Sequence, residues 1–192
     1  MRLILASASP RRAEILRDAG IGFETRVAMV DESRRPSELP DDYVRRLALA
    51  KAQAAMNAKD DGDILYVGAD TIVLAGDAIL GKPESEEEAR AMLWQLSGAV
   101  HEVRTGLAVL RRPVSTERVV VETTRVHFAP LSEEDIDSYV ATGEPFDKAG
   151  AYAIQGVAGR YVTRVEGCYF NVVGLPLARL WSLMRELGWE QS

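Results

Sequence analysis

An α/β fold with a mixed β-sheet is predicted by the order in which strand and helix signals follow one another. In the first half of the chain, short apolar runs typical of buried strands alternate with amphipathic helical segments. Two longer segments rich in Val and Thr, 100–110 and 118–128, then flank Arg111-Arg112-Pro113, which is typical of an antiparallel hairpin. Alternation favours parallel pairing and a hairpin requires antiparallel pairing, so one sheet should contain both.

The first half of the chain has clear helix signals. Ser9-Pro10 favours a helix start, because Ser is a preferred N-cap and Pro fits the first helical position, and Gly20 marks the end. A second helix is expected from Asp41 or Asp42 to about Lys59, with apolar residues along one side. The predicted elements are strands at 3–6, 23–27 and 64–68, helices at 10–19 and 41–59, a loop at 29–40, and a hairpin of 71–74 with 78–80.

The second half is divided by capping residues. Ser85 with Glu88 three residues later has the pattern of a capping box, and Ser132 is a preferred helix cap. Gly98 and Gly143 follow the two helices that these residues begin. The predicted elements are helices at 86–96, 133–142 and 177–187, the hairpin of 100–110 with 118–128, a Gly-rich loop at 143–159, and a strand at 161–166.

Length and composition restrict the class of protein. The chain has 192 residues, of which 47% are hydrophobic, so we expect one globular domain spanning residues 1–192, built as two closely packed lobes at most. It carries 29 acidic and 23 basic residues, a formal net charge of −6. Proteins that bind nucleic acid polymers usually have a basic surplus, so such a partner is not expected. A local basic cluster can still bind a small anion.

Cysteine content and the N-terminal segment bear on location. Cys168 is the only cysteine of the sequence, so no disulfide can form within the chain, which suits a reducing compartment. The first apolar run is too short for a secretion signal, and no window approaches 18 uncharged apolar residues. We therefore expect a cytoplasmic protein without a membrane partner.

The segment Ser7-Ala8-Ser9-Pro10-Arg11-Arg12 has the features of an anion site. A strand ends and a helix opens here, so free backbone N–H groups and the positive end of the helix dipole face the turn. Arg11 and Arg12 are unfavourable beside that dipole unless an anion compensates them. The candidate phosphate ligands are Ser7, Ser9, Arg11 and Arg12. A plain helix start with solvated arginines is the alternative.

Carboxylates and lysines supply further candidates. Asp70, in Gly68-Ala69-Asp70-Thr71, is expected at the end of a buried strand, where it could bind Mg²⁺ or orient a water, or only cap its own turn. Glu32 in the long loop is a second carboxylate. Lys82, in Gly81-Lys82-Pro83, and Lys51, on the apolar side of its helix, could bind phosphate. An ordinary turn lysine and a stem that extends to solvent are the alternatives.

Gln155 lies in the Gly-bounded segment 147–156. Its amide has the donor and the acceptor needed to bind the edge of a nucleobase, while a purely structural loop is the alternative. The candidates together supply basic groups for phosphates and two carboxylates for a hard cation. Mg²⁺ is usually held by one or two carboxylates plus substrate phosphates, which matches Asp70 and Glu32.

Five motifs follow one another along the chain in a specific order. They are Ser7-Ala8-Ser9-Pro10-Arg11-Arg12, Gly68-Ala69-Asp70-Thr71, Gly81-Lys82-Pro83, 147–156 and Asn171-Val172-Val173-Gly174-Leu175-Pro176. The set resembles the Maf family of nucleoside triphosphate pyrophosphatases, also called septum formation inhibitor-like proteins, over essentially the whole chain. Ala153 departs from the family pattern, which has Gly there, and Cys168 departs from Ser.

The resemblance implies an ITPase-like fold, in which helices flank a curved mixed sheet and two lobes surround a central cleft. It implies hydrolysis of a nucleoside triphosphate to the monophosphate and pyrophosphate with a divalent cation, Mg²⁺ or Mn²⁺. By motif position Asp70 is the proton acceptor, and Arg12, Thr71 and Gln155 are the positions that sort substrates. This combination is similar to that of the dTTP/UTP pyrophosphatase subgroup.

In the expected mechanism, a triphosphate lies along the helix that Ser9-Pro10 opens, and the cation bridges its oxygens with Asp70 and Glu32. The basic residues that would bind the phosphates are Arg11, Arg12, Lys51 and Lys82, so that Asp70, Glu32 and Lys82 form the catalytic set. Two alternatives stay open, a nucleotide-sensing regulator of cell division with little turnover and a pyrophosphatase for a purine or methylated nucleotide. A homodimer is also left open.

Overall fold

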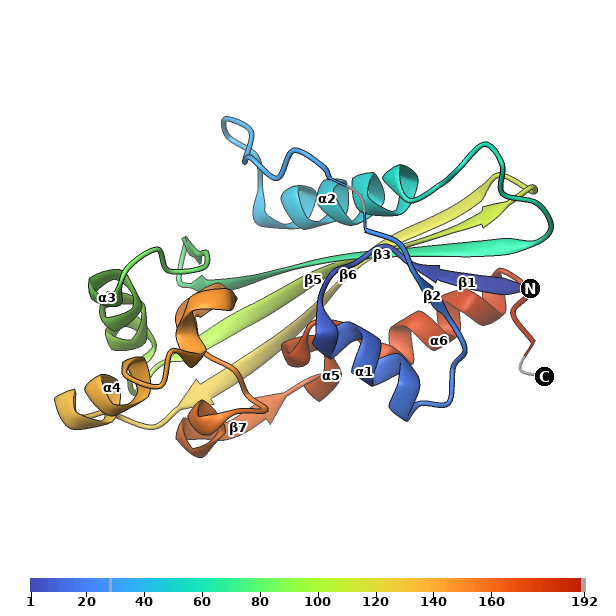
Figure 1. Ribbon diagram of the computed structural model, residues 1–192. Helices are drawn as coiled ribbons and strands as arrows, with labels where there is room; N and C mark the ends of the chain where they lie inside the picture. The colour runs from blue at the N-terminus through green and yellow to red at the C-terminus, as the bar shows by residue number, and fades with distance from the viewer. Residues whose placement is uncertain (28, 191–192) are drawn as a thin grey trace. The chain divides into compact units, whose positions relative to one another are not determined.

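The computed structural model describes residues 1–27 and 29–190. Within this part of the chain, seven strands form one sheet in the order β2-β1-β3-β5-β6-β7, with β4 paired to β3 (Figure 1). The strands are β1 (Arg2–Leu5), β2 (Glu24–Thr25), β3 (Ile64–Ala75), β4 (Ala78–Leu80), β5 (Val100–Arg112), β6 (Thr116–Phe128) and β7 (Val162–Glu166). The α-helices are α1 (Pro10–Asp18), α2 (Pro40–Ala54), α3 (Glu86–Leu96), α4 (Glu133–Val140), α5 (Tyr169–Val173) and α6 (Leu177–Glu186).

The pairing of the strands confirms the predicted mixed α/β sheet. β1 pairs in parallel with both β2 and β3, whereas β3–β4 and β6–β7 are antiparallel. β5 and β6 are neighbours, as the predicted long hairpin requires. The sheet therefore contains parallel and antiparallel pairs, each in the part of the chain where the sequence predicts it.

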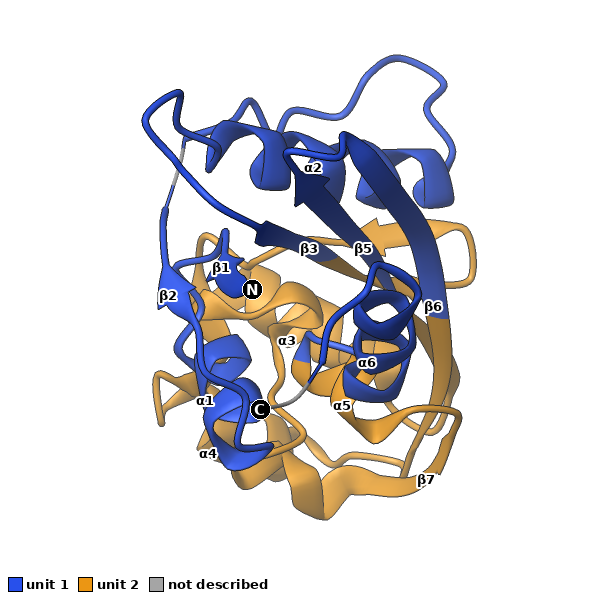
Figure 2. Cartoon of the chain, turned by 90° about the vertical axis from the view of Figure 1, so that its right-hand side faces the viewer, with its two compact units in different colours: residues 1–70, 105–122, 174–192 blue, residues 71–104, 123–173 orange. Residues whose placement is uncertain are grey.

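The chain forms two compact units, each built from separate segments (Figure 2). Unit 1 comprises residues 1–70, 105–122 and 174–192, and unit 2 comprises residues 71–104 and 123–173. β3, β5 and β6 begin in one unit and end in the other. A single domain over residues 1–192 stays a prediction.

In unit 1, helices cover both faces of the sheet. Figures 1 and 2 show α2 on one face and α1 and α6 on the other. Side chains alternate between the faces of a strand, so Ile4 and Tyr66 pack with the alanines of α2, while their neighbours Leu3 and Leu65 are buried toward the opposite face. This alternation explains why residues 3–5 of β1 and the first half of β3 are buried at every position, without an exposed polar face.

Small residues allow α2 to lie very close to the sheet. A Cβ atom added to Gly68 would lie 2.1 Å from the carbonyl oxygen of Ala48, and one added to Gly106 would lie 2.1 Å from that of Val44. Only glycine fits at such an approach of two backbones. The α2 helix, which carries Lys51, is therefore fixed directly against β3 and β5.

Unit 2 has its core beneath α3 and α4, which pack against each other. The core contains Leu93 and Leu96 of α3, Ile136 and Tyr139 of α4, and Phe128 of β6. Both helices begin as predicted, because the Ser85 side chain accepts a hydrogen bond from the Glu88 N–H and Ser132 forms a complete capping box with Asp135.

Among the boundaries that differ from the prediction, three concern α2 and β3, which carry Lys51 and Asp70. α2 begins at Pro40, with Leu39 rather than Asp41 or Asp42 at the N-cap position, because Pro suits the first turn. It ends at Ala54 instead of near Lys59. β3 continues without a break to Ala75, so Asp70 lies within a strand and not at its end. The prediction was wrong here because Asp is rare inside strands, and a local pattern does not show a distant cation that compensates it.

The Gly-rich segment predicted as loop contains three short 3₁₀ helices, at Glu144–Asp147, Ala149–Ala151 and Val157–Tyr161. Ala151 has a φ of 58°, and Ala153 is not among the described residues with positive φ. Ala153, which stands where the family that the chain resembles has Gly, therefore introduces no left-handed strain.

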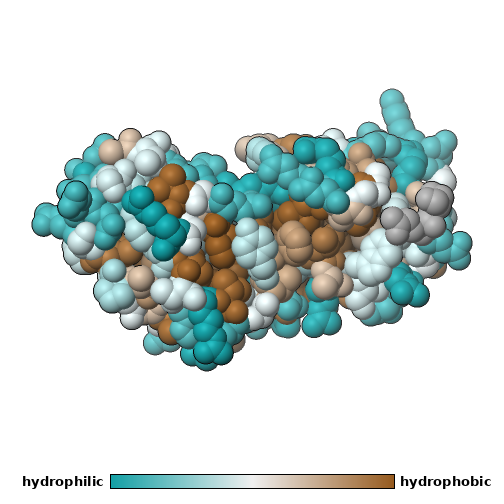
Figure 3. Space-filling model, turned by 90° about the horizontal axis from the view of Figure 1, so that it is seen from below, coloured by the Kyte–Doolittle hydropathy of each residue, from teal (hydrophilic) through white to brown (hydrophobic). Residues whose placement is uncertain are grey.

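No helix among residues 1–27 and 29–190 is long and apolar enough to span a membrane. On the face seen in Figure 3, hydrophilic residues alternate with contiguous patches of hydrophobic ones.

His101 forms a buried polar contact in unit 2. Its Nε2 atom lies 2.8 Å from the Tyr152 hydroxyl, and its ring packs edge-on against Phe128 and Tyr152. Burial lowers the pKa of His101 from 6.5 to about 4. The imidazole is therefore neutral in the folded protein under conditions in which it would be charged in the unfolded chain.

We expect His101 to make stability pH-dependent between pH 6.5 and about 4. The unfolded chain binds more protons than the folded protein in this range, so the free energy of unfolding decreases as the pH is lowered from 6.5 to about 4, by up to about 3 kcal/mol. Urea unfolding of the wild type and of His101→Gln across this range measures the effect. Parallel pH dependences in the two proteins would contradict it.

Candidate functional site

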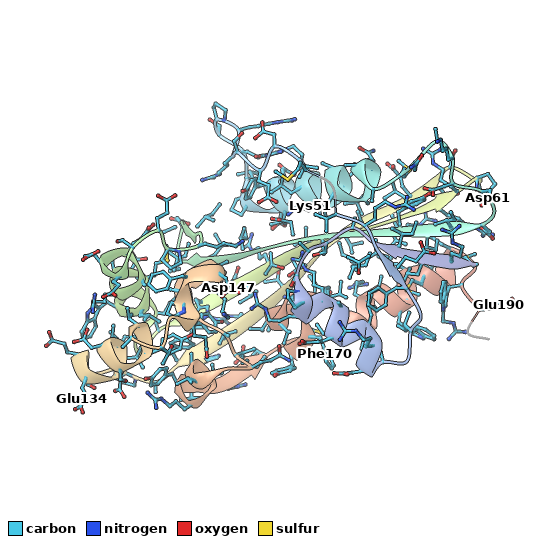
Figure 4. All side chains as sticks on the ribbon, viewed as in Figure 1. Lys51, Asp61, Glu134, Asp147, Phe170 and Glu190 are labelled. Atoms are coloured by element: carbon cyan, nitrogen blue, oxygen red, sulfur yellow. The ribbon has the colours of Figure 1, made fainter. Side chains whose placement is uncertain are left out.

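In unit 1, the predicted site residue Lys51 contacts two others, Glu32 and Asp70. Lys51 extends from α2, Asp70 from the middle of β3, and Glu32 from the loop before α2. The Lys51 Nζ atom lies 2.6 Å from Asp70 Oδ1 and 2.8 Å from Glu32 Oε1 (Lys51 is labelled in Figure 4). The side chains of Lys51 and Asp70 are 15% and 13% exposed, while that of Glu32 is 60% exposed. A largely buried ammonium group thus joins one buried and one accessible carboxylate.

The surroundings of Asp70 shift the pKa of its carboxyl group upward. Burial raises the pKa of this carboxyl, and the nearby charge of Glu32 acts in the same direction. Lys51, by charge and hydrogen bond, and Arg12, by charge, oppose the shift without cancelling it. A carboxylate with a raised pKa is a better proton acceptor than an ordinary surface aspartate. Asp70 is therefore suited to accept a proton from a water.

Arg12 is fixed by the protein around the turn between β1 and α1. Its Nε donates to the Gly174 carbonyl oxygen at 2.7 Å, and its Nη1 donates to Ala69 O at 2.8 Å and to Ser7 Oγ at 3.2 Å. Ser7, which is buried, also accepts a hydrogen bond from Ser9 N at 3.1 Å. Arg12 thus ties the turn to the strand residue that precedes Asp70.

The other two residues predicted at the start of α1 are less enclosed. Ser9 takes the N-cap position with an extended backbone, but its side chain forms no capping hydrogen bond. Arg11 is half-buried in the first turn of α1, which contains no acidic residue. The positive end of this helix therefore lies next to a basic side chain, as the sequence predicts.

The loop that carries Glu32 is anchored to α2 by residues that the sequence analysis did not identify. Tyr43 donates to the Glu32 carbonyl oxygen at 2.8 Å. Arg46 donates to Glu38 through Nε at 2.6 Å and Nη2 at 2.8 Å, and also to Ser33 O at 3.0 Å. The hydrogen bonds from Arg46 are the main cause that lowers the pKa of Glu38 to about 2. Tyr43 and Arg46 are three residues apart on a helix, but nothing local in the sequence indicates their partners in the loop.

Three predicted residues, Thr71, Lys82 and Gln155, belong to unit 2. Thr71 follows Asp70 directly in β3 and is half-buried, whereas Lys82 and Gln155 are exposed. The Gly81 carbonyl next to Lys82 accepts a hydrogen bond from Gly150 N at 2.9 Å, which fixes this turn within the unit. That Lys82 and Gln155 bind the same ligand as Asp70 stays a prediction.

A divalent cation suits the two carboxylates of the site. No cluster of three or more His, Cys, Asp and Glu side chains able to hold a metal occurs in the described part of the chain. Asp70 and Glu32, however, each place an oxygen against the same Lys51 nitrogen, so the two carboxylate groups lie near each other around one cationic group. Carboxylate oxygens are the ligands that Mg²⁺ prefers, and one or two of them are usual where substrate phosphates complete the coordination.

Comparison of the sequence with known proteins assigns the chain to a family. A family model described as Maf-like protein matches residues 2–187. The chain is 52% identical over 190 residues to a dTTP/UTP pyrophosphatase of Hahella chejuensis, covering 97% of this chain and 92% of the relative. It is 51% identical over 189 residues to one of Geotalea uraniireducens (97% and 95% covered) and 48% identical over 188 residues to one of Geobacillus sp. (98% and 99% covered). The chain therefore belongs to the Maf family.

Proposed function

We propose that this protein hydrolyses dTTP and UTP to the nucleoside monophosphate and pyrophosphate. Relatives about 50% identical over nearly the whole chain have the name dTTP/UTP pyrophosphatase. The observation that carries the proposal is the contact of Lys51 with both Asp70 and Glu32. It combines a cation for phosphate with a carboxylate whose pKa is raised. A cytoplasmic location suits this role, because the nucleotide pool is there.

The chain's own residues supply proton transfer and charge neutralisation. Asp70 accepts a proton from the water that attacks the α-phosphorus, a step that its raised pKa favours. Lys51 neutralises Asp70 and Glu32 and so reduces their repulsion of an incoming triphosphate. The side chains proposed to bind phosphate oxygens are Ser7, Ser9, Arg11, Arg12, Lys51 and Lys82.

Asp70 and Glu32 would hold a divalent cation, Mg²⁺ or Mn²⁺. When bound, this cation would neutralise charge on the phosphate oxygens and polarise the phosphoryl group. Glu32 is suited to exchange partners, because its side chain is 60% exposed while its backbone carbonyl is fixed by Tyr43.

Substrate selection is assigned to Arg12, Thr71 and Gln155. Gln155 is exposed, and its side-chain amide offers a donor and an acceptor to the edge of a base. Arg12 lies in unit 1, where its guanidinium group donates a hydrogen bond to the carbonyl oxygen of Ala69, the residue before Asp70. The combination is proposed to favour dTTP and UTP over purine and methylated nucleotides.

Product analysis tests the proposed function. Purified protein with Mg²⁺ or Mn²⁺ is expected to release pyrophosphate, and not phosphate, from dTTP and UTP, with slower release from ATP, GTP and CTP. A chelator should stop the release, and added Mg²⁺ should restore it. Nucleotide binding without single-turnover pyrophosphate release would instead favour a sensor of nucleotides, and preference for a purine would contradict the assigned substrate.

A further inference from the structure

The segment that carries Gln155 is held on both sides by one pair of side chains in unit 2. Tyr139 of α4 accepts a hydrogen bond from Ala153 N at 3.2 Å, and Glu144 Oε2 accepts one from Val157 N at 3.1 Å. The two side chains are joined to each other, since the Tyr139 hydroxyl donates to Glu144 Oε1 at 2.8 Å. These contacts lie two residues before and two residues after Gln155.

The Glu144 carboxylate also supports this segment by direct packing. A Cβ atom added to Gly156 would lie 2.1 Å from Glu144 Oε1, so the backbone next to Gln155 rests against the carboxylate. The Glu144 backbone is itself fixed, because its carbonyl oxygen accepts a hydrogen bond from Lys148 Nζ at 2.7 Å. A further hydrogen bond, from Gly156 N to Ala153 O at 3.1 Å, closes the turn.

Tyr139 is a rigid partner in this arrangement. It is fully buried, and burial together with the hydrogen bond to Glu144 raises the pKa of its hydroxyl. The hydroxyl therefore stays protonated and keeps donating to Glu144 while it accepts from Ala153 N. Gln155 itself is exposed, so its backbone is fixed while its side chain remains accessible.

We propose that Glu144, acting with Tyr139, is a positioning residue that orients Gln155 and thereby determines discrimination between bases. This inference rests on the proposed function, in which Gln155 binds the base. Selectivity by hydrogen bonds depends on the direction of donor and acceptor, so a loose Gln155 would bind wrong bases almost as well as the right one. Glu144 contributes without contacting the base.

Substitutions at Glu144 and Tyr139 test the proposal. Glu144→Ala removes both acceptors and Tyr139→Phe removes the hydroxyl, so backbone hydrogen exchange over residues 153–157 should become faster in both. The ratio of kcat/KM for UTP to that for ATP should fall about five- to tenfold, the effect of one lost hydrogen bond. The lower ratio should result from a higher KM for UTP, with kcat nearly unchanged.

A conservative variant and a matched control separate positioning from general damage. Glu144→Gln keeps one acceptor oxygen but cannot accept both hydrogen bonds, so its UTP-to-ATP ratio should lie between those of the wild type and Glu144→Ala. Glu134→Gln makes the same chemical change at an exposed position of α4 and should match the wild type in every measurement (Glu134 is labelled in Figure 4).

Calorimetry of UMP and AMP binding measures discrimination between the two bases without turnover, as the ratio of the two affinities. Unchanged exchange in Glu144→Ala, or faster exchange with an unchanged UMP-to-AMP ratio, overturns the proposal. Failure of the wild type to release pyrophosphate would overturn the proposed function, and it is distinguishable because exchange and calorimetry still report on Glu144.

Discussion

Asp70→Asn is expected to lower pyrophosphate release from dTTP and UTP by a factor on the order of 10² to 10⁴, the usual contribution of a general base. The amide has the shape of the carboxylate but accepts a proton far less readily. The protein should stay folded, because Lys51 keeps its contact with Glu32 at 2.8 Å. Initial rates, with circular dichroism to confirm folding, measure both effects.

The pH profile of the wild type gives a second view of the same group. Asp70 has to be ionised to accept a proton, and its pKa is raised mainly by burial. Activity should therefore begin to fall at a higher pH than the ordinary aspartate value of 3.8 would give. Asp61→Asn, an exposed control in the turn before β3, should retain wild-type activity (Asp61 is labelled in Figure 4). Full activity of Asp70→Asn would exclude Asp70 as the proton acceptor.

Gly68→Ala should have the largest effect on stability, a loss of at least about 3 kcal/mol. The new methyl group would lie 2.1 Å from the Ala48 carbonyl oxygen and 2.7 Å from Ala52 N, and backbone atoms cannot rotate away. α2 would have to move off β3, although the total stability of a domain is only about 5–15 kcal/mol. Urea unfolding measures the loss.

The same change should also impair activity in the molecules that remain folded. Ala48 and Ala52 lie on either side of Lys51 along α2, so displacement of the helix moves Lys51 Nζ away from Asp70. A shift of about 1 Å at a reacting group can cost about 10²-fold in rate. Gly22→Ala is the matched control, because a Cβ atom there meets nothing within 4 Å, and it should change stability by less than about 0.5 kcal/mol. If Gly68→Ala unfolded at the same urea concentration as the wild type, this result would contradict the close approach of α2 to β3 at Gly68.

The features predicted correctly from the sequence are those with a short-range cause. Ser132 caps α4 through Asp135, three residues away, and the pattern is visible in any window that contains both. The predicted strands within β1 and β3 are runs of buried apolar residues. Helix starts and strand identities follow from such local signals because the physical interaction is itself local.

The supports of the candidate site depend on contacts between distant residues. Arg46 meets Glu38 across a loop, and Tyr139 meets Ala153 fourteen residues further on. Neither spacing follows the period of a helix or a strand, so no pattern in the sequence predicts the pairs. The extension of β3 through Asp70 has the same cause, since the cation that compensates this carboxylate comes from another element. Residues that touch the substrate can be proposed from sequence motifs. The residues that hold those side chains in place can be identified only from the three-dimensional structure.

The division into two units has a consequence for how this chain can vary. The polypeptide passes between the units at residues 70/71, 104/105, 122/123 and 173/174, and the first three passages lie inside β3, β5 and β6. Neither unit is one continuous stretch of sequence, so no single truncation or gene fusion can remove or exchange one of them. A circular permutation cut at any of those three passages would break a strand. A single crossover within the gene is therefore expected to divide at least one of the two units between the two parent sequences.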